Sequence, residues 1–509
     1  MWDKHDENLE LALSLLWGER ALPMAGKSSS AEIHRRLNHP VIDADGHWIE
    51  FEPTLLEYLD GVAGPTMVDR FRREDYLAGT GSSSRMTPAE RQARRITQPA
   101  WWGVPTRNSL DRATAMLPRL LYQRLDEMGI DFAVAYPDHA LFFAAIRDHE
   151  LQLAAYRAYN IMAADLFRGL GDRLIPAASI PMHTPAEAIE ELEFATKLGL
   201  KVTLMRSLIR RPIPAAPKTA DALLYAFWPD SLGLDSEYDY DPVWAKCVAL
   251  RVMPTFHTSS HGIGTRVSYS NYVYNHIGHF AAAGEAVCKS LFLGGVTRRF
   301  AGLKFAFLEG GVGWACMLYN DLINHWRKRN RVALENTNPA NLDVEVVAEA
   351  FRRYGTEPLL AYIDQLASLR QAPGNVEPVD DFARCGITRS EEIRDLFVDR
   401  FYFGCEVDDP MTAWAFRTDV NPGGVKLHPM MGSDIGHFDV VEMTNVLAEA
   451  YELAERQQLD ENAFRDFVFG NSVRFWGGSN PEFFQGTVVE KQAAAVLAES
   501  APSHCTAAR

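Results

Sequence analysis

Short apolar segments alternate with longer stretches of helical periodicity along most of the chain. The short segments are rich in β-branched and aromatic residues, whereas stretches such as PAEAIEELEFATKLG repeat apolar residues every three to four positions. The expected strands are residues 41–45, 131–137, 174–181, 201–205, 252–258, 304–311, 401–407 and 426–434. Eight strands that alternate with helices predict an α/β protein, namely a closed (β/α)₈ barrel of the TIM type.

The chain is longer than a minimal barrel requires, and the excess falls in a few places. The predicted organisation is an N-terminal helical extension (1–40), a barrel (41–480) with insertions at 59–118 and 327–395, and a C-terminal tail (481–509). The first insertion contains a Ser-, Pro- and Arg-rich stretch with the pair Trp101 and Trp102, which predicts a lid over the barrel mouth. The second insertion is expected to be helical.

Composition excludes several classes of partner. The chain has 51 Lys and Arg against 67 Asp and Glu, a formal net charge of −16, whereas nucleic-acid surfaces need clustered basic residues. No apolar run approaches the length that crosses a bilayer, and acidic residues precede the apolar segment near the N-terminus, unlike in a secretory signal. The six cysteines are scattered without a CxxC pair, which favours a reducing compartment. We therefore expect a cytoplasmic protein with no nucleic-acid or membrane partner.

Polar residues gather where the predicted strands end. In VIDADGHWIE, Asp43, Asp45 and His47 alternate, so their side chains share one face of a strand. This face is either a polar edge in water or a set of ligands for a positive charge. Acids and histidines also follow the fifth to eighth strands, namely His257, His261, Glu309, Glu406, Asp434 and His437.

A metal site explains this pattern better than a polar edge does. Active sites of such barrels lie at the carboxyl ends of the strands, and a bound dication removes the cost of burying several carboxylates together. Asp45 and His47 are therefore interpreted as the first ligands. Asp43 is expected to hydrogen-bond to the backbone at the rim of the barrel.

Several motifs together resemble the amidohydrolase superfamily, in the branch that includes aminocarboxymuconate-semialdehyde decarboxylase and the amidohydrolase 2 proteins. They are IDADGHWIEFEP at the first strand, PTFHTSSHG at the fifth, FLEGGVGW at the sixth and GSDIGHFD at the eighth. The resemblance runs from about residue 40 to about residue 480. It implies a metal-dependent barrel enzyme, with a homodimer as a family-level expectation.

The resemblance also implies a set of metal ligands. In that family the first strand supplies an HxH pair, the fifth a His and the eighth an Asp, which correspond here to Asp45, His47, His257 and Asp434. This donor set suits Zn²⁺, Mn²⁺ or Fe²⁺. Decarboxylases of the branch commonly carry a His on the sixth strand, where this chain has Glu309. Glu309 is expected either to act as a base beside one ion or to bridge two, so the site holds one or two ions.

Two further residues are assigned to proton transfer. Asp434 or His437 is expected to deprotonate a water molecule bound to the metal. The alternative for His437 is that it only orients Asp434.

Substrate contacts are assigned to His261, Arg206 and Glu406, which follow the fifth, fourth and seventh strands. An ordinary loop position is the alternative for His261, and an ion pair with Arg206 is the alternative for Glu406. His276 and His279 in NHIGHF are interpreted as helix residues with an interior or surface role.

Four functions remain open at this stage. The first is hydrolysis of a small organic substrate by metal-activated water. The second is nonoxidative decarboxylation, and the third is oxygenation by a non-haem iron or di-iron centre acting as a monooxygenase or hydroxylase. The fourth is a non-catalytic barrel that binds a ligand. Aromatic residues on segments that reach the barrel mouth indicate an apolar or aromatic substrate; they are Trp101, Trp102, Trp314, Tyr269, Tyr272 and Tyr274.

Overall fold

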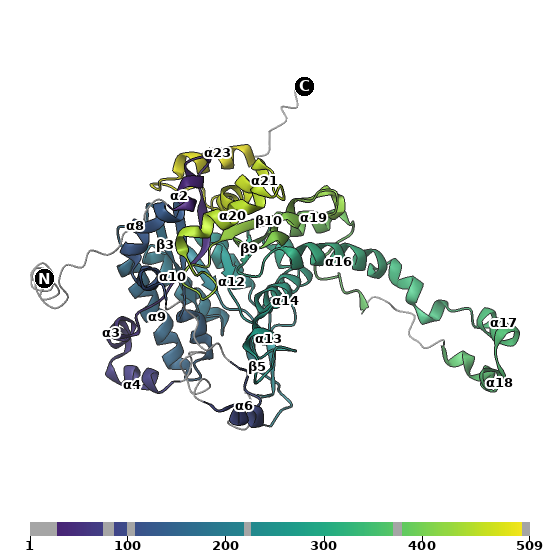
Figure 1. Cartoon of the computed structure of the whole chain (residues 1–509). Coiled ribbons are helices and arrows are strands. Elements are labelled where there is room, and N and C mark those ends of the chain that lie inside the picture. Colours follow the sequence, from purple (N-terminus) through teal and green to yellow (C-terminus); the bar gives the residue numbers. More distant parts are fainter. Residues whose placement is uncertain (1–27, 75–85, 99–106, 218–224, 370–378, 501–509) are drawn as a thin grey trace, which may run out of the picture.

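Eight parallel strands form one sheet that curves into a nearly closed barrel (Figure 1). The computed structural model describes residues 28–74, 86–98, 107–217, 225–369 and 379–500. The strands are β1 (Ile42–Trp48), β2 (Phe132–Pro137), β3 (Leu174–Ile180), β4 (Val202–Met205), β7 (Pro254–Phe256), β8 (Phe305–Phe307), β9 (Phe401–Glu406) and β10 (His428–Gly432). They follow one another around the barrel in chain order, so the predicted (β/α)₈ fold and its eight strand segments are confirmed.

Helices connect the strands and cover the outside of the barrel (Figure 1). The longer ones are α3 (Glu52–Ala63), α8 (Pro118–Met128), α9 (His149–Leu166), α10 (Pro185–Lys197), α12 (Asp241–Leu250), α14 (His279–Leu293), α16 (Gly313–Arg329), α17 (Val344–Tyr354), α20 (Val446–Glu455) and α23 (Glu490–Ser500). The shorter ones are α2 (Ser29–His34), α4 (Pro65–Arg73), α6 (Pro88–Arg94), α7 (Ser109–Met116), α13 (Tyr272–His276), α15 (Val296–Arg299), α18 (Glu357–Leu360), α19 (Glu391–Phe397), α21 (Glu461–Arg465) and α22 (Asn471–Trp476). Short 3₁₀ segments occur at Ala140–Ala145, Ala333–Thr337, Pro339–Asn341, Ile363–Leu369, Pro410–Phe416, Pro422–Gly424 and Met443–Asn445.

The start of α10 illustrates how the sequence fixes a helix boundary. Thr184 accepts a hydrogen bond from the backbone of Glu187, whose side chain in turn accepts one from the backbone of Thr184, and Pro185 occupies the first helical position. This capping box satisfies backbone donors that the helix itself leaves free. The helix therefore begins directly after β3 and returns the chain along the outside of the sheet.

Asp43 joins the first and last strands. Its buried carboxylate accepts hydrogen bonds from the backbone of Asp45 (3.2 Å) and from the backbone (2.9 Å) and hydroxyl (2.5 Å) of Ser433. Nearby, the backbone N–H of Asp434 donates to the carbonyl of Asp45 at 2.9 Å. These bonds hold the carboxyl ends of β1 and β10 side by side, and the rim role predicted for Asp43 is confirmed.

Stacked phenylalanines pack between strands β7, β8 and β9 and the helices outside them, where Trp244 of α12 contacts Phe305 and Trp314 of α16 contacts Phe307. Phe256 stacks on Phe305 and Phe307 with ring centroids 6.4 and 5.6 Å apart, and Phe307 stacks on Phe403 at 6.2 Å. All four rings are buried. Aromatic burial of this kind makes the strands a rigid base for the residues that follow their carboxyl ends.

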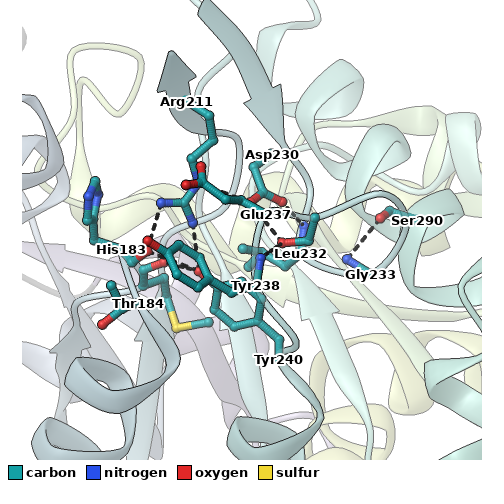
Figure 2. Close-up of polar contacts among 12 residues, drawn as sticks. His183, Thr184, Arg211, Asp230, Leu232, Gly233, Glu237, Tyr238, Tyr240 and Ser290 are labelled. Atoms are coloured by element: carbon teal, nitrogen blue, oxygen red, sulfur yellow. Dashed lines mark hydrogen bonds and ion pairs between the residues drawn. The ribbon is translucent and has the colours of Figure 1, made fainter. Parts of the chain in front are cut away.

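An antiparallel hairpin, β5 (Ile209–Pro212) with β6 (Phe227–Asp230), follows β4 at the carboxyl end of the barrel. Figure 2 shows how a buried network anchors it. Arg211 donates to Asp230 at 3.1 Å, to the carbonyl of His183 at 2.8 Å and to the hydroxyl of Tyr240 at 2.9 Å. Tyr240 donates onward to the carbonyl of Met182 at 2.6 Å. The hairpin is thereby tied to the loop after β3.

The described part of insertion 59–118 contains α4, α6 and α7. Arg91 in α6 donates to the carbonyl of Tyr269 at 3.2 Å, and the backbone of Gln98 donates to Ser268 at 2.8 Å. These contacts place α6 against the loop after β7, on the side of α13 and β5 in Figure 1. Trp101 and Trp102 lie outside the described residues, so the lid remains a prediction.

Insertion 327–395 and the C-terminal segment differ in how they pack. After α16 the chain extends away from the barrel as an arm that carries α17 and α18 (Figure 1). The described part of segment 481–509 instead packs on the amino end of the barrel, where Phe484 contacts Phe132 with centroids 5.6 Å apart and Val489 and Val496 are fully buried. In the described ranges, no helix has the length and apolarity needed to span a membrane.

Candidate metal centre

Strand β1 contributes Asp45 and His47, as the sequence predicts. Both side chains are buried and lie at the carboxyl end of the strand. His47 donates from Nδ1 to the carbonyl of Pro137 at 3.3 Å, because a carbonyl can only accept. This bond fixes the tautomer and leaves the lone pair of Nε2 free to coordinate a metal. Nε2 lies 3.7 Å from Oδ1 of Asp45.

Strands β7 and β8 bring His257 and Glu309 to the same place. Nε2 of His257 lies 2.8 Å from Oε2 of Glu309 and 4.0 Å from Oδ1 of Asp45, and all three side chains are buried. The backbone of Glu309 has a φ of +56°, in the left-handed region that a non-glycine residue seldom adopts. Such strain persists where surrounding structure imposes it, as it does at binding sites.

Strand β10 contributes Asp434, with His437 one turn further on. Oδ1 of Asp434 lies 3.2 Å from Nε2 of His47 and 2.7 Å from Nδ1 of His437. The ring of His437 stacks on His47 with centroids 3.9 Å apart, and its Nε2 lies 3.5 Å from Asp138. Asp138 directly follows β2 and was missed at the sequence level, although an acid straight after a strand is the same signal that identified the others.

The donor atoms of this cluster fit a metal ion. Seven buried side-chain atoms of the ligand residues have no hydrogen-bond partner; they are Oδ1 of Asp45, Nε2 of His47, both ring nitrogens of His257, Oε2 of Glu309 and both carboxylate oxygens of Asp434. Unpartnered buried polar atoms are rare and costly in folded proteins, and a coordinated cation satisfies them. Two sets have donor atoms within 4.8 Å of one another, one of Asp45, His47 and His257 and one of His47, Glu309, Asp434 and His437.

The charges of the cluster are unbalanced without a cation. Burial raises the pKa of Asp45 and of Glu309 well above their usual ranges, and the charge of Asp434 adds to both shifts. Burial lowers the pKa of His257 well below its usual range, and the charge of His47 adds to that shift. A dication would reverse the shifts of the two carboxyl groups by favouring their ionised forms, and it would add to the shift of His257 by favouring the neutral imidazole.

A cavity of about 190 Å³ adjoins the cluster. Glu309, Glu406 and Asp409 line one part of it, and His276 and His279 line another. Glu309 also belongs to a third set of nearby donors, with Glu406 and Asp439. Asp439 lies two residues beyond His437 and, like Asp138, was missed. Burial, followed by the charge of Asp434, raises the pKa of Glu406 to about 8 and that of Asp439 to about 7.

The three residues expected to contact substrate have different surroundings. Glu406 lines the cavity, and His261 lies beside His279 with ring centroids 4.2 Å apart. Arg206 donates to the carbonyl of Leu141 at 2.8 Å. No ion pair joins Arg206 to Glu406 within the described ranges, so the alternative of a structural pair between them is not supported.

Known proteins were compared with this chain. A family model described as Amidohydrolase matches residues 42–361. Among solved structures, an amidohydrolase from Mycobacterium avium subsp. paratuberculosis superposes with a TM-score of 0.50 and 19% identity, over 87% of this chain and 100% of that chain. A 2,6-dihydroxybenzoate decarboxylase from Rhizobium superposes with a TM-score of 0.41 and 14% identity, over 87% of this chain and 100% of that chain. A manganese-bound 5-carboxyvanillate decarboxylase from Novosphingobium aromaticivorans superposes with a TM-score of 0.45 and 12% identity, over 86% of this chain and 97% of that chain.

No curated protein matched the chain. The likeness to the Mycobacterium structure supports a shared fold, and the family match covers well over half of the chain, including the first three of the four strands that bring candidate ligands to the site. The matched residues take in Asp45, His47, His257 and Glu309. This chain therefore belongs to the amidohydrolase family of divalent-metal-dependent enzymes.

Proposed function

We propose that this protein hydrolyses a small organic substrate with the help of a divalent metal. The observation that carries the proposal is the convergence of buried, unpartnered donor atoms from four strands of the barrel. Asp45, His47, His257 and Asp434 would hold the ion, with Glu309 beside it. When bound there, the metal would lower the pKa of a water molecule and polarise a substrate carbonyl.

Asp434 and His437 form the acid–base pair that hydrolysis needs. Burial would raise the pKa of Asp434, but the charge of His437 holds it below the usual range. Burial opposes the charge of His437, but Asp434 and the hydrogen bond donated to Asp138 raise its pKa well above 6.5. Asp434 is therefore a carboxylate able to accept a proton from water, and His437 is an imidazolium able to donate one to the leaving group.

The electrostatics of the cavity favour hydrolysis over the alternatives. A decarboxylase must bring a substrate carboxylate close to the metal. Here the wall nearest the cluster carries Glu309, Glu406 and Asp409, which would repel such a group once a bound dication favours their ionised forms. A neutral carbonyl meets no such penalty.

Decarboxylation is the second candidate, and one observation favours it. Burial and the charge of Asp434 raise the pKa of Glu309 well above its usual range. A carboxyl group kept neutral in this way can protonate the carbon that loses carbon dioxide. Glu309 would then take the role that a histidine has in the decarboxylases this sequence resembles.

Isotope labelling separates the two reactions. Protein loaded with Zn²⁺ or Mn²⁺ would be incubated in H₂¹⁸O with esters, amides and lactones and, separately, with aromatic carboxylic acids. We expect ¹⁸O in a product carboxylate from the first set and no release of carbon dioxide from the second. Release of carbon dioxide without ¹⁸O incorporation would replace hydrolysis by decarboxylation. The His437→Gln variant serves as the control for background hydrolysis, because it lacks the proposed acid.

A further inference from the structure

Three histidines from separate segments come together beside the metal centre. The ring of His261 lies 4.2 Å from that of His279 and 5.9 Å from that of His276, and His276 lies 4.6 Å from His279, measured between centroids. Phe280 separates them from the metal ligands, with its ring 3.8 Å from His279 and 4.8 Å from His257. His276 and His279 line the same cavity as Glu309.

The nitrogens of this cluster lack partners. His279 is only 4% exposed, yet neither of its ring nitrogens makes a hydrogen bond, and Nε2 of His261 is likewise buried and unpartnered. Nε of the nearby Arg266 is also buried without a partner, while its Nη2 donates to the carbonyl of Gly278 at 2.9 Å. Unsatisfied buried polar groups are rare and costly, so four such nitrogens on His279, His261 and Arg266, beside the cavity that His279 lines, call for a ligand.

The local charge selects an anion over a metal ion. Arg266 carries a fixed positive charge, and within the described ranges no ion pair joins Arg266, His261, His276 or His279 to an acid. A dication would be repelled by this guanidinium. The described side chains also hold no set of three donors close enough for a metal that includes any of these histidines. Imidazole and guanidinium N–H groups instead suit the oxygens of a carboxylate.

We propose that His261, His276, His279 and Arg266 form a subsite that binds a carboxylate of the substrate, away from the carbon that reacts. The proposal rests on the proposed function for its substrate, and it narrows that substrate to small carboxylic acids with a separate hydrolysable bond. Glu309 and Glu406 line the same cavity as His276 and His279, so the two groups together would orient the substrate. The carboxylate points to the histidines, and the neutral carbonyl points to the metal.

Burial keeps the histidines of the subsite uncharged. It lowers the pKa of His261 to about 4, with the charges of His276 and Arg266 adding to the shift. The pKa of His279 falls further for the same reason, followed by the charge of His261. The imidazoles therefore act as neutral hydrogen-bond donors near neutral pH, with Arg266 as the fixed charge.

Binding of benzoate by isothermal titration calorimetry tests the subsite without any substrate. The metal-loaded full chain should bind benzoate saturably and more tightly than the neutral analogue benzamide. His279→Phe keeps the ring beside Phe280 but removes both nitrogens, and Arg266→Met keeps the side-chain length but removes the charge. Each variant should weaken benzoate binding by about tenfold or more, as expected for losing a hydrogen bond to a charged group. His325→Asn, on the exposed surface of α16, should bind like the parent.

Thermal unfolding distinguishes binding from a structural role. His279→Phe removes unsatisfied buried nitrogens, so its melting temperature should equal or exceed that of the parent. A clear fall in melting temperature with unchanged benzoate binding would overturn the proposal. Absence of saturable benzoate binding to the parent would overturn it as well. Loss of a bound Zn²⁺ from His279→Phe, measured after dialysis, would replace the anion subsite with a metal site.

One variant separates this proposal from the hydrolase proposal. His257→Ala should lose metal but keep benzoate binding. Loss of benzoate binding in His257→Ala, with retention in His279→Phe, would place benzoate on the metal and overturn the subsite. If no ¹⁸O is incorporated and His279→Phe still loses benzoate binding, the hydrolase proposal is wrong and the carboxylate subsite is supported.

Discussion

The imidazole of His257 meets the carboxylate of Glu309 at 2.8 Å, yet neither of the two atoms in contact makes a hydrogen bond. The strands that carry them are neighbours, with Phe256 of β7 paired to Phe307 of β8. Each side chain thus leaves the carboxyl end of its strand toward the same point. A cation at that point would satisfy both atoms, and for this reason we propose that Glu309 belongs to the metal centre and does not only line the cavity.

Removing His257 should empty the centre without unfolding the chain. We expect His257→Ala to bind metal at least tenfold more weakly, since losing even an outer partner of a ligand costs about 10–100-fold. Metal content after dialysis, measured by inductively coupled plasma mass spectrometry, checks this. His325→Ala provides the matched control. Metal content equal to that of the parent, with an unchanged melting temperature, would remove His257 from the ligand set.

Glu309→Gln should report how many ions the centre holds. Gln keeps nearly the same volume, so packing losses will not confuse the result. With one ion, the metal count stays at one and turnover slows. With two, the count falls from two towards one, because Glu309 also lies near Glu406 and Asp439.

Glu406→Gln is the companion variant for the metal count. It should affect a second ion but not the first, because Glu406 belongs only to the set with Glu309 and Asp439. Unchanged metal and unchanged turnover in Glu309→Gln would exclude Glu309 from both schemes. Two irons per chain in the parent would favour the oxygenase alternative over hydrolysis.

His437→Gln should lower turnover more than metal binding. The imidazolium lies between Asp434 and Asp138, where it can donate a proton to a leaving group. Loss of such an acid typically costs about 10²–10⁴ in kcat. Steady-state kinetics with a substrate found by the labelling experiment, together with metal analysis, measures both quantities. If kcat is retained and only the metal is lost, His437 serves to orient Asp434.

Acid stability should depend on His428, which begins β10 at the opposite end of the barrel from the metal centre. Burial, followed by the charges of Arg474 and Lys304, lowers the pKa of His428 to about 3. An unfolded His titrates near 6.5. Between these values the unfolded chain binds a proton that the folded chain does not. The contribution of the neutral, buried His428 to the free energy of unfolding is therefore fully present above about pH 6.5. Below that pH it falls by about 1.4 kcal/mol per pH unit.

A phenylalanine at this position should remove that dependence. His428→Phe keeps a ring on Tyr402, from which the His428 ring is 4.7 Å away. Circular dichroism at a series of pH values should show acid unfolding of the variant at a lower pH than that of the parent, with His325→Asn unfolding like the parent. An identical acid midpoint in parent and variant would contradict this assignment.

Local sequence was sufficient for the strands and for most of the residues at their ends. The apolar segments identified the eight barrel strands but not the hairpin of β5 and β6, because strand burial follows from residue type over a few positions. Asp45, His47, His257, Glu309 and Asp434 were proposed for the site because each lies at or just beyond the carboxyl end of such a segment. In a parallel barrel the carboxyl ends of all strands meet at one end, so position along the strand already determines which end a residue faces.

The tertiary structure decided what lies between strands. Asp439 and His261 sit on loops whose paths depend on packing, whereas His276 ends α13 and His279 begins α14. The chain between His261 and His279 folds back through α13 and Gly278, which brings the two rings together. The sequence placed Glu406 next to Arg206 as one alternative, yet Glu406 faces the cavity and Arg206 bonds to Leu141. Hydrophobic periodicity records which face of an element is buried, but the distance between two loop side chains depends on contacts spread over the whole fold. For that reason the chain alone predicted a metal barrel, and only its folded form brought His261, His276 and His279 together beside the cavity that Glu309 and Glu406 line.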